Sequence, residues 1–119
     1  MLGLDLVPRL RVDGFVVDGV DIDELDITRP DDILAYFRSF KPGLVINCAA
    51  YTAVDKAESE PEKAFAVNRD GPKHLAGACA KVNIPLIHIS TDYVFDGMAE
   101  RPYIESDPAS PLGVYGQSK

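Results

Sequence analysis

Two short, nearly continuous apolar runs, residues 44–50 and 85–90, constrain the fold of this chain more than any other feature. Neither run shows the alternation of apolar and polar residues that is typical of a strand with one face in solvent. Strands of this kind are buried on both faces, as in parallel sheets that are covered by helices. The two runs therefore predict an α/β fold.

Segments with helical spacing precede and separate these runs. Apolar residues recur at intervals of three and four over residues 2–12, 30–40 and 61–81, and a last helix is expected to begin near Val114. Helices that alternate with strands across short joints predict a parallel sheet with flanking helices.

Local signals refine these elements. We expect Thr28 to be the N-cap of the helix over 30–40, and Pro72 to bend or break the helix over 61–81. Residues 15–20 are rich in β-branched side chains and predict a further short strand.

The composition limits the classes of partner. The 119 residues include 12 Lys and Arg against 19 Asp and Glu, for a formal net charge of −7. This charge disfavours a nucleic-acid backbone or an anionic membrane as a partner, and we expect neither. The two cysteines, Cys48 and Cys79, have no metal-site spacing, and the first residues lack the order of a signal peptide. We therefore expect a cytoplasmic protein without a metal site.

Polar residues that could carry chemistry follow the predicted strands. They are Asp21, the segment 47–52, and Ser90-Thr91-Asp92. In open parallel sheets, ligands bind beyond the carboxyl ends of the strands. These positions are therefore the first candidates for a site.

Tyr115 and Lys119 form the sharpest pair, because residues four apart lie on one face of a helix. An ammonium group close to a phenol favours the phenolate and lowers the pKa of a tyrosine. Such a tyrosine can exchange a proton with a carbonyl or alcohol oxygen near neutral pH. The spacing alone is common, and taken alone it is better explained by a solvated lysine beside a half-buried tyrosine.

Three longer strings give this pair more weight. They are Asn-Cys-Ala-Ala-Tyr-Thr-Ala-Val-Asp at 47–55, Ser-Thr-Asp-Tyr-Val-Phe-Asp-Gly at 90–97, and Pro-Leu-Gly-Val-Tyr-Gly-Gln-Ser-Lys at 111–119. In this order they resemble the extended short-chain dehydrogenase/reductase superfamily and, within it, the dTDP-4-dehydrorhamnose reductase family. The resemblance covers essentially the whole chain, although Gly113 stands where the family usually has Asn.

The resemblance implies the roles of the catalytic residues. Thr91, Tyr115 and Lys119 correspond to the catalytic triad of the family. Tyr115 is expected to protonate the C4 keto oxygen of a dTDP-linked 4-keto-6-deoxy sugar, while NADPH or NADH supplies the hydride.

The resemblance also implies which residues bind the cofactor: Gly3, Asp21, Asp26, Ile27, Asn47, Ala49, Ala50, Thr52, Tyr115 and Lys119. Asp21 suits a ribose 2′-hydroxyl and hence NAD, but it is explained equally well as a solvated acid in a turn. The choice between NAD and NADP therefore stays open.

The fold implied by the resemblance is a partial Rossmann-type parallel sheet, with residues 1–119 as a single, incomplete NAD(P)-binding Rossmann domain. Of the family's glycine-rich turn only Gly3 has a counterpart, and the C-terminal substrate region has none. We expect the 119 residues by themselves to be inactive, and the exposed strand edges to favour a homodimer. A non-catalytic regulatory homologue and a nucleotide-sugar epimerase or dehydratase are the alternatives.

Overall fold

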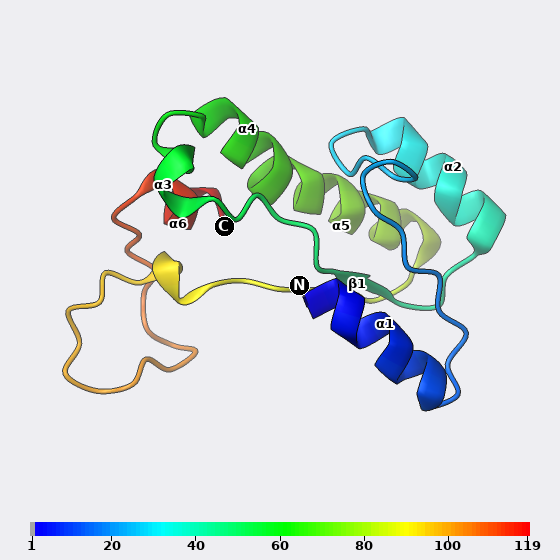
Figure 1. The fold of residues 1–119 in the computed structure, drawn as a ribbon, viewed down its shortest axis with the longest axis horizontal. Coiled ribbons are helices and arrows are strands. Elements are labelled where there is room, and N and C mark those ends of the chain that lie inside the picture. Colours follow the sequence, from blue (N-terminus) through cyan, green and yellow to red (C-terminus); the bar gives the residue numbers. More distant parts are fainter. Residues whose placement is uncertain (1) are drawn as a thin grey trace.

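The computed structural model describes residues 2–119, and helices make up most of its regular structure (Figure 1). The elements in chain order are α1 (Leu2–Val12), α2 (Pro30–Phe40), β1 (Val45–Asn47), α3 (Val54–Ala57), α4 (Pro61–Phe65), the π-helical turn η1 (Ala66–Asp70), α5 (Gly71–Val82), β2 (Leu86–His88), the 3₁₀ turn η2 (Asp92–Val94) and α6 (Val114–Ser118). In the described chain no helix is long and apolar enough to cross a membrane.

The sheet consists of β1 and β2, which pair in parallel, with Ile46 opposite Ile87 and Asn47 opposite His88. This confirms the parallel sheet of an α/β fold. In the view of Figure 1, β1 lies between α5 and α1. Both strands are shorter than the apolar runs that predict them, because the ladder joins only three residues of each.

The strand predicted over residues 15–20 is wrong: this segment is irregular. Phe15 and Val16 are 63% and 92% exposed. The Arg11 guanidinium, rather than a neighbouring strand, donates to the Val17 carbonyl at 3.0 Å. A strand needs a backbone partner, and none of the residues that the structure describes supplies one here.

Helix α2 has the predicted bounds but not the predicted cap. Its N-cap is Arg29. The Thr28 N–H and hydroxyl both donate to Asp26 Oδ1, at 2.9 and 2.7 Å, in the preceding turn. Asp and Thr side chains commonly close such local turns, and here the turn holds Thr28 outside the helix.

The long helix predicted over 61–81 is one helical path with an irregular turn inside it. The Gly71 N–H donates to the Ala66 carbonyl, five residues back, which is the hydrogen bond of a π-turn. Pro72 follows in the first turn of α5, where its missing N–H costs nothing. Asn83 ends α5 in the left-handed conformation, with φ of 56°. The irregularity expected near Pro72 is therefore this π-turn, which lies directly before it.

Two apolar clusters form the core. One joins α2 and α5 through the buried residues Ile33, Phe37, Leu75, Ala78 and Cys79. The other joins α3, α4 and α6 through Ala57, Ala64 and Tyr115. The second cluster fixes the position of α6, and so of the Tyr115 ring.

Candidate active site

Helix α6 carries Tyr115 and packs directly on the backbone of η2. A Cβ atom at Gly116 would overlap the Tyr93 carbonyl oxygen, so only glycine permits this approach. The Tyr115 ring, 9% exposed, meets the Tyr93 ring edge-on at a centroid distance of 5.5 Å. The segment that follows β2 therefore forms the surface against which α6 packs.

Lys119 follows α6 and reaches back to the carboxyl end of β2. Its Nζ donates to the Ile89 carbonyl at 2.6 Å. Burial lowers the pKa of the Lys119 ammonium below that of an ordinary lysine. The Lys119 N–H donates to the Gly116 carbonyl, which tightens the last turn. Tyr115 and Lys119 thus lie on consecutive turns, with Tyr115 against Tyr93 and Lys119 against the residue that follows β2.

Thr91 lies at the start of η2. Its hydroxyl accepts from the Tyr93 N–H at 3.3 Å and donates to Asp92 Oδ1 at 3.1 Å. The structure brings Thr91 to the turn on which α6 rests. Within residues 2–119 it shows no hydrogen bond that joins Thr91, Tyr115 and Lys119 to one another.

Residues after β1 form the second part of the candidate site. Asn47 is buried, and both ends of its carboxamide are bonded: Oδ1 accepts from the Ala49 N–H at 3.0 Å, and Nδ2 lies 3.1 Å from His88 Nδ1. Ala49 and Thr52 are exposed and Ala50 is half-buried. Asn47 therefore shapes a loop of small, accessible residues.

His88 and Gly3 border this loop from two sides. Burial, and next the positive charge of Lys119, lowers the pKa of His88, which favours the neutral ring that faces Asn47. A Cβ atom at Gly3 would lie 3.5 Å from Cys48 Cβ, so the first turn of α1 touches the loop. His88 is half-buried, and its ring has a hydrogen-bond partner in the Asn47 carboxamide.

The remaining cofactor candidates lie on the segment before α2. Asp21 is exposed and accepts from the Ile22 N–H at 2.8 Å in its own turn. The hydrogen bonds from Thr28 lower the pKa of Asp26. The side chain of Ile27 packs over Gly71, where a Cβ atom would meet it. Within residues 2–119, the structure shows no hydrogen bond between these three residues and α6.

Two polar residues outside the predicted site, Glu58 and Asn68, hold α6 in place. Glu58 Oε1 accepts from the Val114 N–H at 2.8 Å, at the start of the helix. Asn68 Nδ2 donates to Ser118 Oγ at 2.9 Å, near its end. Asn68 lies among apolar residues on one face of the helix predicted over 61–81. A polar residue in such a position indicates a buried side chain with hydrogen-bond partners, and this signal could have identified Asn68.

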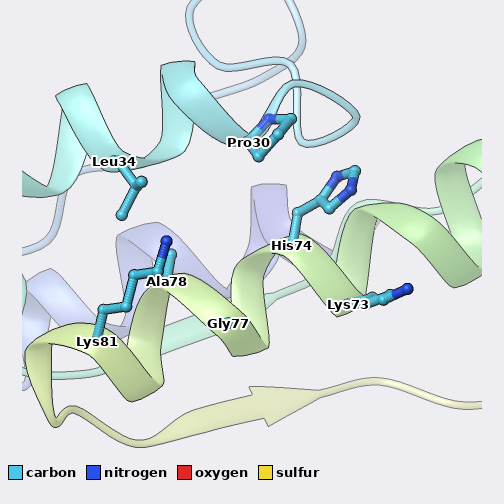
Figure 2. A pocket seen from close by; sticks show the side chains of 7 residues that line it. All are labelled: Pro30, Leu34, Lys73, His74, Gly77, Ala78 and Lys81. Carbon is cyan, nitrogen blue, oxygen red and sulfur yellow. The ribbon is translucent and has the colours of Figure 1, made fainter.

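A separate shallow groove lies between α2 and α5 (Figure 2). Figure 2 shows Pro30 and Leu34 on one side, and Lys73, His74 and Lys81 on α5. None of the candidate site residues lines this groove.

Comparison with known proteins gives one family. The family model described as the RmlD substrate binding domain matches residues 1–119. A dTDP-4-dehydrorhamnose reductase from Streptomyces griseus is 48% identical over 119 residues, which are 100% of this chain and 39% of that relative. The chain thus spans less than half the length of this relative.

Solved structures of the same family are similar to this chain in both sequence and fold. A dTDP-4-dehydrorhamnose reductase from Clostridium acetobutylicum superposes with a TM-score of 0.95 at 42% identity, over 98% of this chain and 42% of that one. The corresponding reductase from Bacillus anthracis, solved in complex with NADP, gives a TM-score of 0.94 at 36% identity, over the same shares. At this level of identity and superposition, the likeness extends through α6 and the loop after β1.

Proposed function

The chain belongs to the family of the RmlD substrate binding domain, and from this we propose that it acts within an NAD(P)H-dependent reductase. The proposed reaction of the whole protein is the reduction of dTDP-4-dehydrorhamnose, a nucleotide-linked 4-keto-6-deoxy sugar, to dTDP-rhamnose. One observation carries the proposal: Lys119, one turn after Tyr115, donates to the Ile89 carbonyl at the carboxyl end of β2.

In this proposal Tyr115 is the general acid. Its phenol gives a proton to the C4 keto oxygen as hydride adds to C4, so that the ketone becomes a secondary alcohol. The Lys119 ammonium stabilises the resulting phenolate, and the Thr91 hydroxyl binds the same sugar oxygen. The Ile89 carbonyl, which accepts from Lys119 Nζ, keeps the ammonium at the end of the strand.

The proposed cofactor is NADPH or NADH, which supplies the hydride when bound. The residues after β1 suit a dinucleotide, because Ala49 and Ala50 present little bulk and Gly3 leaves the adjoining helix turn uncrowded. Asn47 would hold this loop in shape, while Thr52 and Lys119 offer polar contacts. Asp21, Asp26 and Ile27 are proposed for the adenosine end. The Bacillus anthracis relative solved with NADP supports a nicotinamide dinucleotide.

Residues 1–119 are proposed to form one incomplete NAD(P)-binding Rossmann domain. We further propose that the rest of the whole protein completes the nucleotide-sugar site, so that the 119 residues alone are inactive.

Exposed apolar side chains such as Leu4, Phe15, Val16 and Ile87 support a homodimer, which light scattering would test. The free thiols of Cys48 and Cys79 support a cytoplasmic location.

An assay of the whole protein with dTDP-4-dehydrorhamnose and NADPH or NADH tests the proposal. The expected result is oxidation of the cofactor that depends on the sugar, with a C4 alcohol seen in the product by NMR. An epimerised or dehydrated sugar without net consumption of cofactor would assign a different enzyme class. Cofactor or sugar binding without turnover would favour the non-catalytic homologue.

A further inference from the structure

The groove between α2 and α5 (Figure 2) is basic, although acids outnumber bases in the chain. Its lining includes Lys73, His74 and Lys81 but no carboxylate. A second hollow, at the C-terminal ends of the same two helices, is lined by Arg38 and Lys41 and again by no carboxylate. We call the two hollows together the α2–α5 groove.

The lysine and arginine side chains of the α2–α5 groove have no acidic partner among residues 2–119. The ion pairs that the structure shows lie elsewhere. All of these side chains are exposed: Arg38, Lys41, Lys73 and Lys81. Their charge can therefore attract an anionic group from outside the chain.

The ring of His74 is held in place by the segment before α2. Its Nδ1 lies 3.4 Å from the Ile27 carbonyl oxygen, which can only accept, so Nδ1 carries the hydrogen. Asp70, one turn before His74, is bonded to the Arg69 side chain at 2.8 and 3.1 Å. An anion in the groove would favour the protonated ring of His74, in which Nε2 donates as well.

His74 and Lys81 are spaced to bind two groups of one ligand. Seven residues make about two helical turns, so both side chains lie on one face of α5, with Cα atoms about 10 Å apart along its axis. Figure 2 shows both side chains directed toward α2, with Gly77 and Ala78 between them. A ligand that contacts both residues therefore needs anionic groups about 10 Å apart.

Gly77 leaves the floor of the first hollow open. A Cβ atom added there would meet no atom within 4 Å, so packing does not require glycine at this position. Glycine inside a helix is also less favourable than alanine. The missing side chain leaves room for the backbone of a ligand between His74 and Lys81.

The dimensions of the groove favour an extended peptide over a compact small molecule. The hollows have volumes of about 180 and 330 Å³, at or below the lower end of the roughly 300–1,000 Å³ of small-molecule sites. In a polyproline II segment, side chains three residues apart lie on one side, about 9 Å from one another. This spacing matches that of His74 and Lys81. The net charge of −7 disfavours a nucleic acid.

We propose that the α2–α5 groove docks an extended acidic segment of a partner protein. Carboxylates three residues apart bind His74 and Lys81, and a further carboxylate binds Arg38. The groove is separate from the candidate active site, since none of the candidate site residues lines it. The inference therefore does not rest on the proposed reductase function.

The first test titrates the whole protein with the blocked heptapeptide Glu-Pro-Pro-Glu-Pro-Pro-Glu, whose carboxylates lie on one side of a polyproline II helix. We expect saturable amide NMR shifts confined to residues 30–42 and 73–84, and weaker binding at high salt. The uncharged peptide Gln-Pro-Pro-Gln-Pro-Pro-Gln should not bind. Equal binding of the two peptides, or shifts outside these ranges only, would overturn the proposal.

Two double variants of equal net charge separate a local contact from a general charge effect. Arg38→Gln with Lys81→Gln removes charge from the groove, whereas Arg9→Gln with Lys63→Gln removes it from α1 and α4. From the strength of exposed ion pairs, the groove variant should bind the peptide about twofold to twentyfold more weakly. The control should change the affinity less than about twofold. Equal losses in the two variants would overturn the proposal.

Gly77→Leu provides a variant without a change of charge. Its side chain should fill the floor of the first hollow and weaken binding of the peptide, because α5 leaves open space at this position. An unchanged affinity would overturn the proposed position of the peptide between His74 and Lys81.

Two other occupants of the groove would give different results. Binding of sodium tripolyphosphate that is lost in the groove variant, without binding of the peptide, would assign a phosphate ligand. Self-association of the whole protein that is lost in the groove variant by light scattering, again without binding of the peptide, would assign a second copy of this chain. Either result overturns the proposal of an acidic partner segment.

Discussion

The Ile89 carbonyl oxygen accepts a hydrogen bond of 2.6 Å from Lys119 Nζ, which joins the segment after β2 to the residue that follows α6. These two residues are 30 positions apart in the sequence, and the bond aligns the ammonium with the carboxyl end of the strand. The bond sets where the ammonium lies, and burial of Lys119 lowers its pKa.

The first prediction concerns the pH dependence of this charge. Burial lowers the pKa of Lys119 below the ordinary 10.5, so its ammonium is lost at a lower pH than that of a solvated lysine. The kcat/KM of the whole protein should therefore begin to fall on the alkaline side before pH 10.5. Lys119→Met should lower kcat at every pH and move that limb to higher pH, because loss of the Lys119 ammonium no longer contributes to it. An alkaline limb that stays at the wild-type pH in Lys119→Met would contradict the assignment.

The second prediction concerns the close approach of α6 to η2. A methyl group at Gly116 would overlap the Tyr93 carbonyl, and overpacking of this kind costs about 1–3 kcal/mol. Gly116→Ala should lower the free energy of unfolding by this amount in urea denaturation. Gly77→Ala is the matched control, since α5 leaves open space there and alanine favours a helix by about 0.5–1 kcal/mol. Equal effects of the two substitutions would contradict the packing described here.

The third prediction concerns His88. Burial and the nearby Lys119 charge lower its pKa below 6.5 in the folded state. The unfolded chain then binds more protons than the folded one, so the stability that depends on neutral His88 is complete above pH 6.5 and is lost as the pH falls. His88→Gln should reduce the loss of stability between neutral and acidic pH, as measured by urea denaturation. An unchanged pH dependence would show that other groups cause it.

Local signals in the sequence predict the helices well. Pro30 opens α2, and Lys41 ends it in the left-handed conformation with φ of 54°. These features act within a few residues of where they occur, so the helix bounds follow from the sequence. The cap predicted at Thr28 does not form: both Thr28 donors bond to Asp26 in a competing turn, and the N-cap is Arg29.

Non-local partners account for what the sequence does not predict. Residues 15–20 have strand composition, but a strand forms only where another backbone pairs with it. The candidate pair Tyr115 and Lys119 could be selected from spacing and resemblance. Their supports could not, since Asn68 meets Ser118 across 50 residues and Glu58 meets Val114 across 56.

The fourth prediction tests the central claim most directly: Tyr115→Phe in the whole protein, assayed by NADPH oxidation that depends on dTDP-4-dehydrorhamnose. The substitution removes only the hydroxyl and keeps the ring that packs on Tyr93, so the fold should persist. Tyr36→Phe, on the outlying helix α2, is the matched control and should retain wild-type turnover. We expect Tyr115→Phe to lower kcat by about a hundredfold to ten-thousandfold. Wild-type turnover in Tyr115→Phe would contradict it.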